Sequence, residues 1–300
     1  MIDFVGKKRW FFLLSAAIII CGIIFFAAAG IPWGIDFAGG TIMTVKYQED
    51  KPVSHDTLET KLIDLGHDEA TIQEDKDEHT FLVRIEELND EEQTEMRASL
   101  ADLELSVESF DLISDPVAKE KARGAAIAVV VAAIGILIYI SWAFRRLPKP
   151  FRYGTCAIIA LVHDVLIAVS VFAILGSALN LEINLMFVTG LLTVIGYSVN
   201  DTIVVFDRIR ENLGKDTRQP FETVVNNSLV ETLGRSLMTS LTTLLVLVSV
   251  YLFVGEAIRS FLLVLIVGVI SGTYSSIFIA SQALVVWETG AVKKLFNRMA

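Results

Sequence analysis

The sequence predicts a membrane protein of six transmembrane α-helices, with a small α+β domain inserted after the first helix. The 300 residues are 53% hydrophobic with a mean hydropathy of +0.58, which is more apolar than a soluble domain of this size. Charge is also segregated, because a polar and strongly acidic block at residues 36–120 interrupts long apolar runs. Those runs are about as long as a bilayer crossing, which takes roughly 20 residues.

The apolar runs divide the chain into three parts. We expect a tail and first helix in residues 1–35, an extracytoplasmic domain in residues 36–120, and the remaining five helices in residues 121–300. The first run exceeds the roughly 7–15 apolar residues of a signal peptide, so we interpret it as a retained helix. The predicted spans are about 10–29, 123–144, 154–177, 185–206, 237–254 and 260–287.

Lysine and arginine set the predicted orientation, because they accumulate on the cytoplasmic side of membrane proteins. The basic segments alternate with loops that have one basic residue or none, such as residues 177–184 and 255–259. The N- and C-termini are therefore predicted to be cytoplasmic and the acidic block extracytoplasmic. The basic residues are Lys7, Lys8, Arg9, Arg145, Arg146, Lys149, Arg152, Arg208, Arg210, Lys215, Arg218, Lys293, Lys294 and Arg298.

Residues 41–115 predict a ferredoxin-like domain with the element order βαββαβ. Ser54 and either Asn89 or Asp90 are suitable N-caps for its two helices. A turn is expected at Asp75-Lys76-Asp77. Its many carboxylates are typical of a solvated surface, and a role in gripping basic or unfolded polypeptide is the alternative. The predicted strands are 41–47, 70–73, 80–85 and 104–112, and the predicted helices are 55–65 and 90–103.

Composition excludes several classes of function. The acidic block, within a formal net charge of −10, argues against a nucleic-acid partner. No glycine-rich phosphate loop is present, and no Cys/His cluster has metal spacing, so we predict no cofactor and no metal. Cys21 and Cys156 both lie in apolar runs, which makes a disulfide framework improbable. No nucleophile–base constellation indicates an enzyme.

Asp201 is the most informative residue, because it lies inside the predicted span 185–206. An ionisable group in hydrocarbon costs at least about 2.5–3.5 kcal/mol, so a function with a named partner is the default interpretation. At about 1.5 Å per residue, Arg235 at the start of the next span reaches a similar depth. We predict a carboxylate that gains and loses a proton beside a guanidinium. A structural ion pair, or an Arg235 that extends to the interface, is the alternative.

Further polar residues accompany this pair. Polar side chains recur along span four and span five, so two facing stripes would line a hydrated path. The predicted secondary lining is Tyr197, Asn200, Thr239 and Thr242. Asp164, beside His163 in span three, is a third candidate for the proton pathway, and a hydrogen bond that packs helices is an equal alternative.

Glycines mark two other positions. Gly268 and Gly272 form a G-x-x-x-G pattern in span six, which allows close helix packing inside this chain or with a partner. The segment 34–41 is expected to be a tight, non-helical exit from the membrane, with Asp36 as a turn or cap residue.

Four stretches together resemble the SecF family of bacterial protein-export membrane subunits, within the SecD/SecF group of the RND superfamily. Their order and the six-span layout cover essentially the whole chain. The long span-four stretch is highly specific, and the others are moderately so. They are Gly34–Thr41 (GIDFAGGT), Val162–Asp164 (VHD), Val194–Asn212 (VIGYSVNDTIVVFDRIREN) and Gly234–Ser240 (GRSLMTS).

The resemblance implies a fold, partners and an energy source. Members pair with SecD into a twelve-span assembly, act with the SecYEG channel, and use the proton-motive force to promote preprotein translocation across the cytoplasmic membrane. The family's proton path includes an aspartate and an arginine that match Asp201 and Arg235. A third key carboxylate belongs to SecD, so this chain would not complete the path alone. The rival interpretations are half of an RND-type small-molecule or lipid exporter, and a purely structural stabiliser of a membrane complex.

Overall fold

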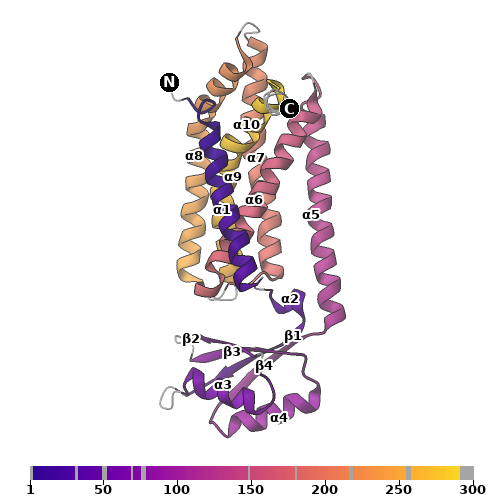
Figure 1. The fold of residues 1–300 in the computed structure, drawn as a ribbon, viewed down its shortest axis with the longest axis vertical. Coiled ribbons are helices and arrows are strands. Elements are labelled where there is room, and N and C mark those ends of the chain that lie inside the picture. Colours follow the sequence, from indigo (N-terminus) through magenta and orange to yellow (C-terminus); the bar gives the residue numbers. More distant parts are fainter. Residues whose placement is uncertain are drawn as a thin grey trace. The chain divides into compact units, whose positions relative to one another are not determined.

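The computed structural model describes residues 3–30, 33–48, 53–68, 70–75, 79–147, 149–179, 181–215, 219–254 and 258–290. The chain forms two compact units, which we describe separately. The membrane unit comprises Met1–Pro32 and Ile127–Ala300, and the outer unit comprises Trp33–Ala126 (Figure 1). Residues 76 and 77 of the predicted turn, Arg218, and the tail residues Lys293, Lys294 and Arg298 lie outside the described residues.

Six helices among the described residues are long and apolar enough to cross a membrane, which confirms the predicted fold class. The last span is composite, because a short π-helical segment, η2, interrupts it. The spans are α1 (Lys8–Ala29), α5 (Asp115–Ala143), α6 (Pro150–Leu179), α7 (Leu185–Lys215), α8 (Phe221–Phe253), and α9 (Arg259–Ser275) with η2 (Ser276–Ala280) and α10 (Ser281–Glu288).

α7 and α8 extend well beyond the apolar runs that predicted them. The extension is charged and is held by ion pairs that the hydropathy pattern does not reveal. Arg208 on α7 pairs with Glu211 on the same helix and with Glu231 on α8, and Lys215 pairs with Glu211. These pairs join the ends of two neighbouring helices, so the two helices continue past the apolar runs.

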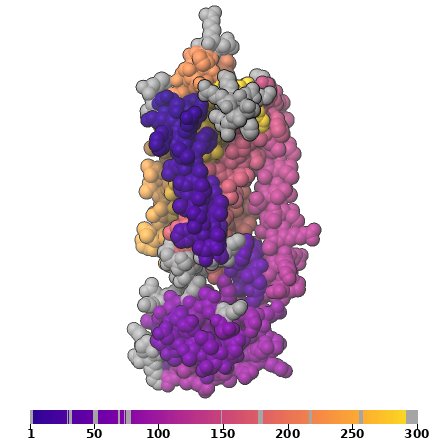
Figure 2. All heavy atoms as spheres, viewed as in Figure 1, coloured from indigo at the N-terminus to yellow at the C-terminus, as the bar shows by residue number. Residues whose placement is uncertain are grey.

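Small residues bring the last span against α7 at the centre of the membrane unit. A Cβ atom added at Gly268 would overlap the side chain of Val194, and one added at Gly272 would lie 2.9 Å from the Cβ of Ser198. The G-x-x-x-G pattern therefore packs inside this chain. α6 covers the same centre, and Figure 2 shows α1 (indigo) on the face of the unit that it displays.

Three spans bury few of their side chains within this chain. Only about a tenth or less of the apolar window of α1, α5 and α8 is buried. Their exposed side chains are large and apolar, as in Trp10, Val131 and Phe253. Such faces require lipid or another helix as a neighbour.

The outer unit confirms the predicted βαββαβ order. Its antiparallel sheet has the strand order β2-β3-β1-β4, and both helices pack on one face (Figure 1). A core of fully buried apolar side chains, including Met43, Val45, Phe81 and Leu62, joins sheet to helices. The elements are β1 (Gly40–Lys46), α3 (His55–Asp64), β2 (Thr71–Asp75), β3 (Thr80–Ile85), α4 (Asp90–Ala101) and β4 (Ser106–Ile113).

The observed helix caps agree with those predicted from the sequence, whereas the segment that follows the first span differs from its prediction. The Ser54 hydroxyl accepts the Thr57 N–H at 3.2 Å, and Asn89 forms a capping box with Glu92. The expectation of a non-helical segment 34–41 is wrong, because α2 (Ile35–Ala38) is a short helix there. Gly39 and Gly40 end it with φ of +76° and +114°, a backbone region that suits glycine.

The predicted role of Asp36 as a turn or cap residue also needs correction. Gly34 occupies the N-cap position of α2, and Asp36 lies in the first turn. Its carboxylate pairs with the Lys121 ammonium on α5 at 2.8 Å. Asp36 therefore ties the start of the outer unit to the helix that ends it.

The close packing of α9 against α7 predicts a position-specific effect of added methyl groups. Gly268→Ala is expected to destabilise the protein by about 1–3 kcal/mol, because overpacking pushes the two helices apart. Gly196→Ala on α7 is the matched control, since a Cβ there meets no atom within 4 Å. Thermal unfolding of the purified protein in detergent measures both. Equal midpoints for the two variants would contradict the packing described here.

Candidate functional site

Asp201 lies half-buried on α7, where it faces α8. Its Oδ1 accepts a hydrogen bond from the Ser236 hydroxyl at 2.6 Å. Its Oδ2 is buried and makes no hydrogen bond of good geometry among the described residues, although the Ser276 hydroxyl on η2 is close enough to interact with the carboxylate. A buried oxygen with spare acceptor capacity is a place where a proton can be added without breaking an existing bond.

Arg235 is close to this carboxylate but does not contact it. The guanidinium is near enough for its charge to act on the carboxylate, but the described residues show no ion pair between the two side chains. Successive helical residues point about 100° apart, so Ser236 faces α7 while Arg235 turns to the exposed surface of α8. Residue counting along the helices placed both at one depth but did not resolve this rotation.

The predicted secondary lining is only partly assembled. The Tyr197 hydroxyl donates to Ser240 on α8 at 3.2 Å. Thr239 and Thr242 are exposed and donate to carbonyls of their own helix, and Asn200 is exposed as well. In the described part of the chain these residues do not enclose a path, because Asn200, Thr239 and Thr242 lie on surface that a partner can cover.

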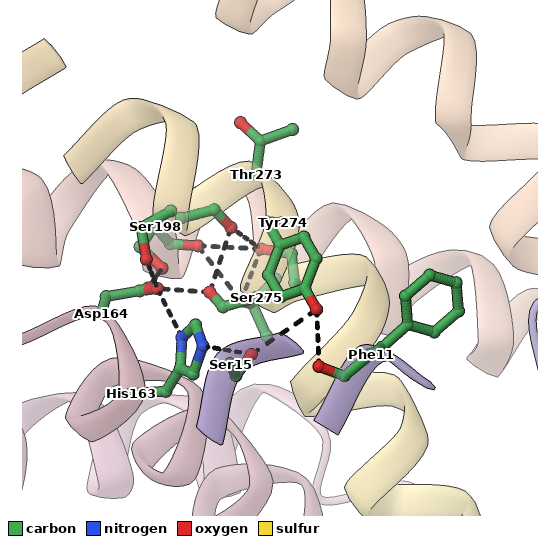
Figure 3. Close-up of polar contacts among 12 residues, drawn as sticks. Phe11, Ser15, His163, Asp164, Ser198, Thr273, Tyr274 and Ser275 are labelled. Carbon is green, nitrogen blue, oxygen red and sulfur yellow. Dashed lines mark hydrogen bonds and ion pairs between the residues drawn. The ribbon is translucent and has the colours of Figure 1, made fainter. Parts of the chain in front are cut away.

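Asp164 occupies a different environment, at the meeting point of α6, α7 and α9. It is 1% exposed. Figure 3 shows the hydrogen bonds that converge on its two oxygens. Ser198 and Ser275 donate to Oδ2 at 2.6 and 2.7 Å, and Ser271 donates to Oδ1 at 2.6 Å. The His163 Nδ1 lies 3.2 Å from Oδ1.

Three serine hydroxyls donate to this carboxylate, and His163 Nδ1 adds a fourth hydrogen bond in the tautomer that carries its hydrogen there. The arrangement also joins three helices through one side chain. Of the two interpretations of Asp164, proton relay and helix packing, this geometry favours packing. We call the group formed by His163, Asp164, Ser198, Ser271 and Ser275 the serine hub.

The serine hub extends to α1. His163 Nε2 lies 2.9 Å from the Ser15 hydroxyl, and the Tyr274 hydroxyl donates to the Phe11 carbonyl at 2.8 Å (Figure 3). A largely apolar cavity of about 310 Å³ lies beside His163 and Ser15, walled by α1, α6 and α9. The polar contacts therefore fix the otherwise apolar α1 to the centre of the bundle.

Ser198 connects the hub to the neighbourhood of Asp201. Its hydroxyl binds Asp164, while its carbonyl accepts the Thr202 hydroxyl at 3.1 Å. Thr202 Oγ1 in turn lies 3.0 Å from Ser276 Oγ. Asp164 on α6 therefore binds the segment of α7 that carries Asp201.

Sequence reasoning missed the serines that hold both carboxylates. Residue type alone does not mark Ser236 and the hub serines as partners of a carboxylate, because serine is common in membrane helices. The four-residue spacing of Ser271 and Ser275 on the last span was the available signal, since residues four apart share a helix face.

Other chemistry is weakly supported by the described residues. His55, Asp56 and Glu59 could group around a metal, but all three are exposed on α3, as solvated acidic residues commonly are. Asp164, His163 and Ser15 follow the order of a nucleophilic triad. All three lie within membrane helices, where backbone N–H groups are bonded along the helix rather than free to bind an oxyanion.

Comparison with known proteins decides the family. The model described as "Protein export membrane protein SecD/SecF, C-terminal" matches residues 93–290, and the SecD/SecF GG motif matches residues 24–51. The "Protein translocase subunit SecF" of Thermobaculum terrenum is 42% identical over 99% of this chain and 98% of its own length. The chain belongs to the SecF family.

Other SecF relatives and solved structures agree. The SecF of Anaerolinea thermophila is 40% identical over 100% of this chain and 98% of its own. The crystal structure of SecDF from Thermus thermophilus, titled a translocon-associated membrane protein, is 34% identical with a TM-score of 0.83. It matches 96% of this chain, which spans 39% of that longer chain. A second SecDF structure gives a TM-score of 0.66 at 33% identity, over 99% of this chain and 40% of that one.

Family membership makes this chain a multi-pass membrane protein and a SecF subunit of Sec protein export. The relatives are named as translocase subunits, not as catalysts. Asp164, Asp201 and Arg235 all fall in the segment that the SecD/SecF model matches. The comparisons favour the export subunit over the RND-type exporter among the hypotheses from sequence.

Proposed function

We propose that this SecF-family chain pairs with a SecD-type chain and uses the proton-motive force to promote preprotein translocation through the SecYEG channel. One observation carries the energy-coupling part. Asp201 is a half-buried carboxylate inside a membrane span, with one oxygen held by Ser236 and the other buried near Ser276 with no hydrogen bond of good geometry in the described part of the chain. Ionisable groups in that position commonly belong to proton pathways.

The incomplete surroundings of Asp201 support a SecD-type partner. Arg235, Thr239 and Asn200 are exposed on the membrane unit, and so are the apolar faces of α1, α5 and α8. This chain also covers only 39% of the SecDF chain that it resembles. A SecD-type chain would supply the missing wall, and with it the rest of a path for protons.

The coupling step is a reversible proton transfer without covalent chemistry. A proton that enters from the extracytoplasmic side binds Asp201 Oδ2 and neutralises the carboxylate, and it later leaves toward the cytoplasm. Moving one charge across the membrane is worth about 2.3 kcal/mol per 100 mV. Since about 1.4 kcal/mol changes an equilibrium tenfold, that energy suffices to bias two packing arrangements of α7 and α8. Arg235 is placed to favour the ionised state from its position on α8.

The predicted topology and domain division remain part of the proposal. Residues 1–35 and 121–300 form the membrane part, with both termini in the cytoplasm, in the bacterial inner membrane. Residues 36–120 form the extracytoplasmic domain, whose motion holds or releases the emerging polypeptide. This domain has a well-formed apolar core and an acidic exposed surface. That exposed surface is the part that contacts the polypeptide.

Co-purification and a vesicle assay test the proposal together. We expect a SecD-type chain to co-purify with this chain from membranes. We also expect vesicles that contain the pair to translocate more preprotein with a proton gradient than after a protonophore collapses it. The proposal is refuted if a drug-binding adaptor co-purifies instead of a SecD-type chain. It is also refuted if the pair increases preprotein translocation equally with and without the protonophore.

A further inference from the structure

The cavity among α1, α6 and α9 lies inside the membrane unit and has a volume of about 310 Å³. Its wall includes Leu14 and Ile18 on α1, Ile167 on α6, and Val267 and Ile270 on α9. All five residues belong to helices that are long and apolar enough to cross a membrane. The medium around the cavity is therefore hydrocarbon rather than water.

The surface of the cavity is almost entirely apolar, and the polar groups at its wall already have partners. The ring nitrogens of His163 lie 3.2 Å from Asp164 and 2.9 Å from the Ser15 hydroxyl (Figure 3). The Tyr274 hydroxyl donates to the Phe11 carbonyl, and the remaining wall hydroxyl is a hub serine that donates to Asp164. Because a buried water needs two to four polar partners, these walls suit an apolar occupant.

Two residues mark where the cavity opens. Leu14 on α1 and Ile270 on α9 are each 54% exposed, whereas Ile167 on α6 is buried. The inner wall is thus formed by α6, and the opening lies on the outer surface of the membrane unit. An apolar molecule in the surrounding hydrocarbon can enter there without crossing a polar barrier.

The dimensions of the cavity distinguish between a chain and a helix as occupant. Its wall on α6 extends from His163 to Val171, which is about 12 Å along the helix axis. A helix segment of that length, about 10 Å across, takes up roughly 900 Å³, three times the volume of the cavity. A cavity of about 150 Å³ is large enough for benzene, so this one accepts a longer, unbranched hydrocarbon chain that runs along the spans.

A basic residue lies on the same side of α1 as the opening. Lys7 directly precedes α1 and stands seven residues before Leu14, so the two share a helix face about 10 Å apart along the axis. Lys8 pairs with Glu222 on α8, whereas Lys7 is exposed and forms no ion pair in the described part of the chain. Lysines at the ends of spans extend to the membrane surface, where they attract lipid phosphates.

We propose that this cavity binds one acyl chain of a membrane phospholipid, with the phosphate of that lipid beside Lys7. The chain enters at Leu14 and Ile270 and packs against Ile167 and Val267. It supplies apolar contacts to α1, whose apolar window is only 11% buried within this chain. Without an occupant, the cavity walls lose those dispersion contacts. The site is independent of proton coupling at Asp201.

Filling the cavity with a side chain tests the site. We expect the protein purified from membranes in mild detergent to retain one phospholipid per chain, which native mass spectrometry counts and identifies. Val267→Phe places a ring where the acyl chain lies, so this variant is expected to lose the phospholipid. Val131→Phe is the matched control, because it adds the same ring at an exposed position on α5 that does not line the cavity. It should retain the phospholipid.

Thermal unfolding gives a second measurement on the same proteins. A ligand that binds only the folded state raises the thermal midpoint. Removal of lipid with excess detergent should therefore lower the midpoint of the wild type, and added phospholipid should restore it. The midpoint of Val267→Phe should respond to neither treatment, because the ring replaces the acyl chain.

A pair of surface variants tests the position of the phosphate and does not disturb the helix packing. Lys7→Gln and Arg9→Gln each remove one positive charge from an exposed residue at the start of α1. Two residues along a helix correspond to a rotation of about 200°, so Arg9 lies on the opposite face from Lys7. We expect weaker phospholipid retention in Lys7→Gln and wild-type retention in Arg9→Gln. This pair decides the question if Val267→Phe does not fold.

Several results would overturn the proposal. One is a wild-type protein that retains no phospholipid, or a Val267→Phe variant that retains as much as the wild type. Another is equal retention by the Lys7 and Arg9 variants. A retained fatty acid or isoprenoid quinone in place of a phospholipid contradicts the assigned ligand. Lower retention in a complex with a partner chain than in this chain alone would show that the partner, and not a lipid, fills the cavity.

Discussion

Asp201→Asn is expected to abolish the proton-motive-force-dependent part of preprotein translocation while the complex still assembles. The asparagine carbonyl can accept the Ser236 hydrogen bond in place of Oδ1, and the side chain keeps its size. It cannot bind and release a proton at physiological pH. Translocation into inverted membrane vesicles, with and without a protonophore, measures the difference, and co-purification of the SecD-type chain confirms assembly.

Asp207→Asn provides the control on the same helix. Asp207 is exposed at the charged end of α7 and pairs with Arg210. Exposed ion pairs contribute little, about 0–1 kcal/mol, so this variant is expected to translocate like the wild type. Wild-type translocation by both variants would remove the basis for proton coupling at Asp201.

The second large effect is expected at Asp164 and concerns folding. Asp164→Ala leaves the Ser198, Ser271 and Ser275 hydroxyls and His163 around an empty acceptor position. Each buried donor left unmet costs about 1–3 kcal/mol, so the loss is comparable with the whole stability of many domains. We expect little folded protein, a much lower thermal midpoint, and weaker recovery of the partner chain.

Ser249→Ala is a suitable reference for that experiment, because Ser249 is exposed on α8 and donates only to its own helix at Leu245. Its midpoint should match that of the wild type. If Asp164→Ala instead folds and assembles normally but loses proton-dependent translocation, the packing role is wrong. Asp164 would then belong with Asp201 in the proton pathway, which is one of the two interpretations that the sequence left open.

The large features of the fold follow from patterns that the sequence carries locally. Apolar runs of bilayer length predict the spans, and the caps at Ser54 and Asn89 predict where helices of the outer unit begin. The short helix α2 does not follow from the sequence, because Gly39 and Gly40 indicate non-helical chain but do not show that a turn of helix precedes them.

The candidate site is predictable in part. The cost of burying a carboxylate in a span points to both Asp201 and Asp164, and only their surroundings distinguish the two. The immediate partner of Asp201 is Ser236 rather than Arg235, since depth along a helix can be counted from sequence but the direction of a side chain depends on how the helices rotate. The serine hub and the π turn arise from contacts among four spans, which no local pattern encodes.

Infrared difference spectroscopy of the assembled complex in membranes tests the central claim most directly. The protonated Asp201 side chain has a carbonyl band that is absent from Asp201→Asn, so a pH titration follows this one group. We expect the band to appear and disappear reversibly within the working pH range. A band that is always present, or never present, at every working pH would show a carboxylate that does not change its charge, and would contradict the mechanism.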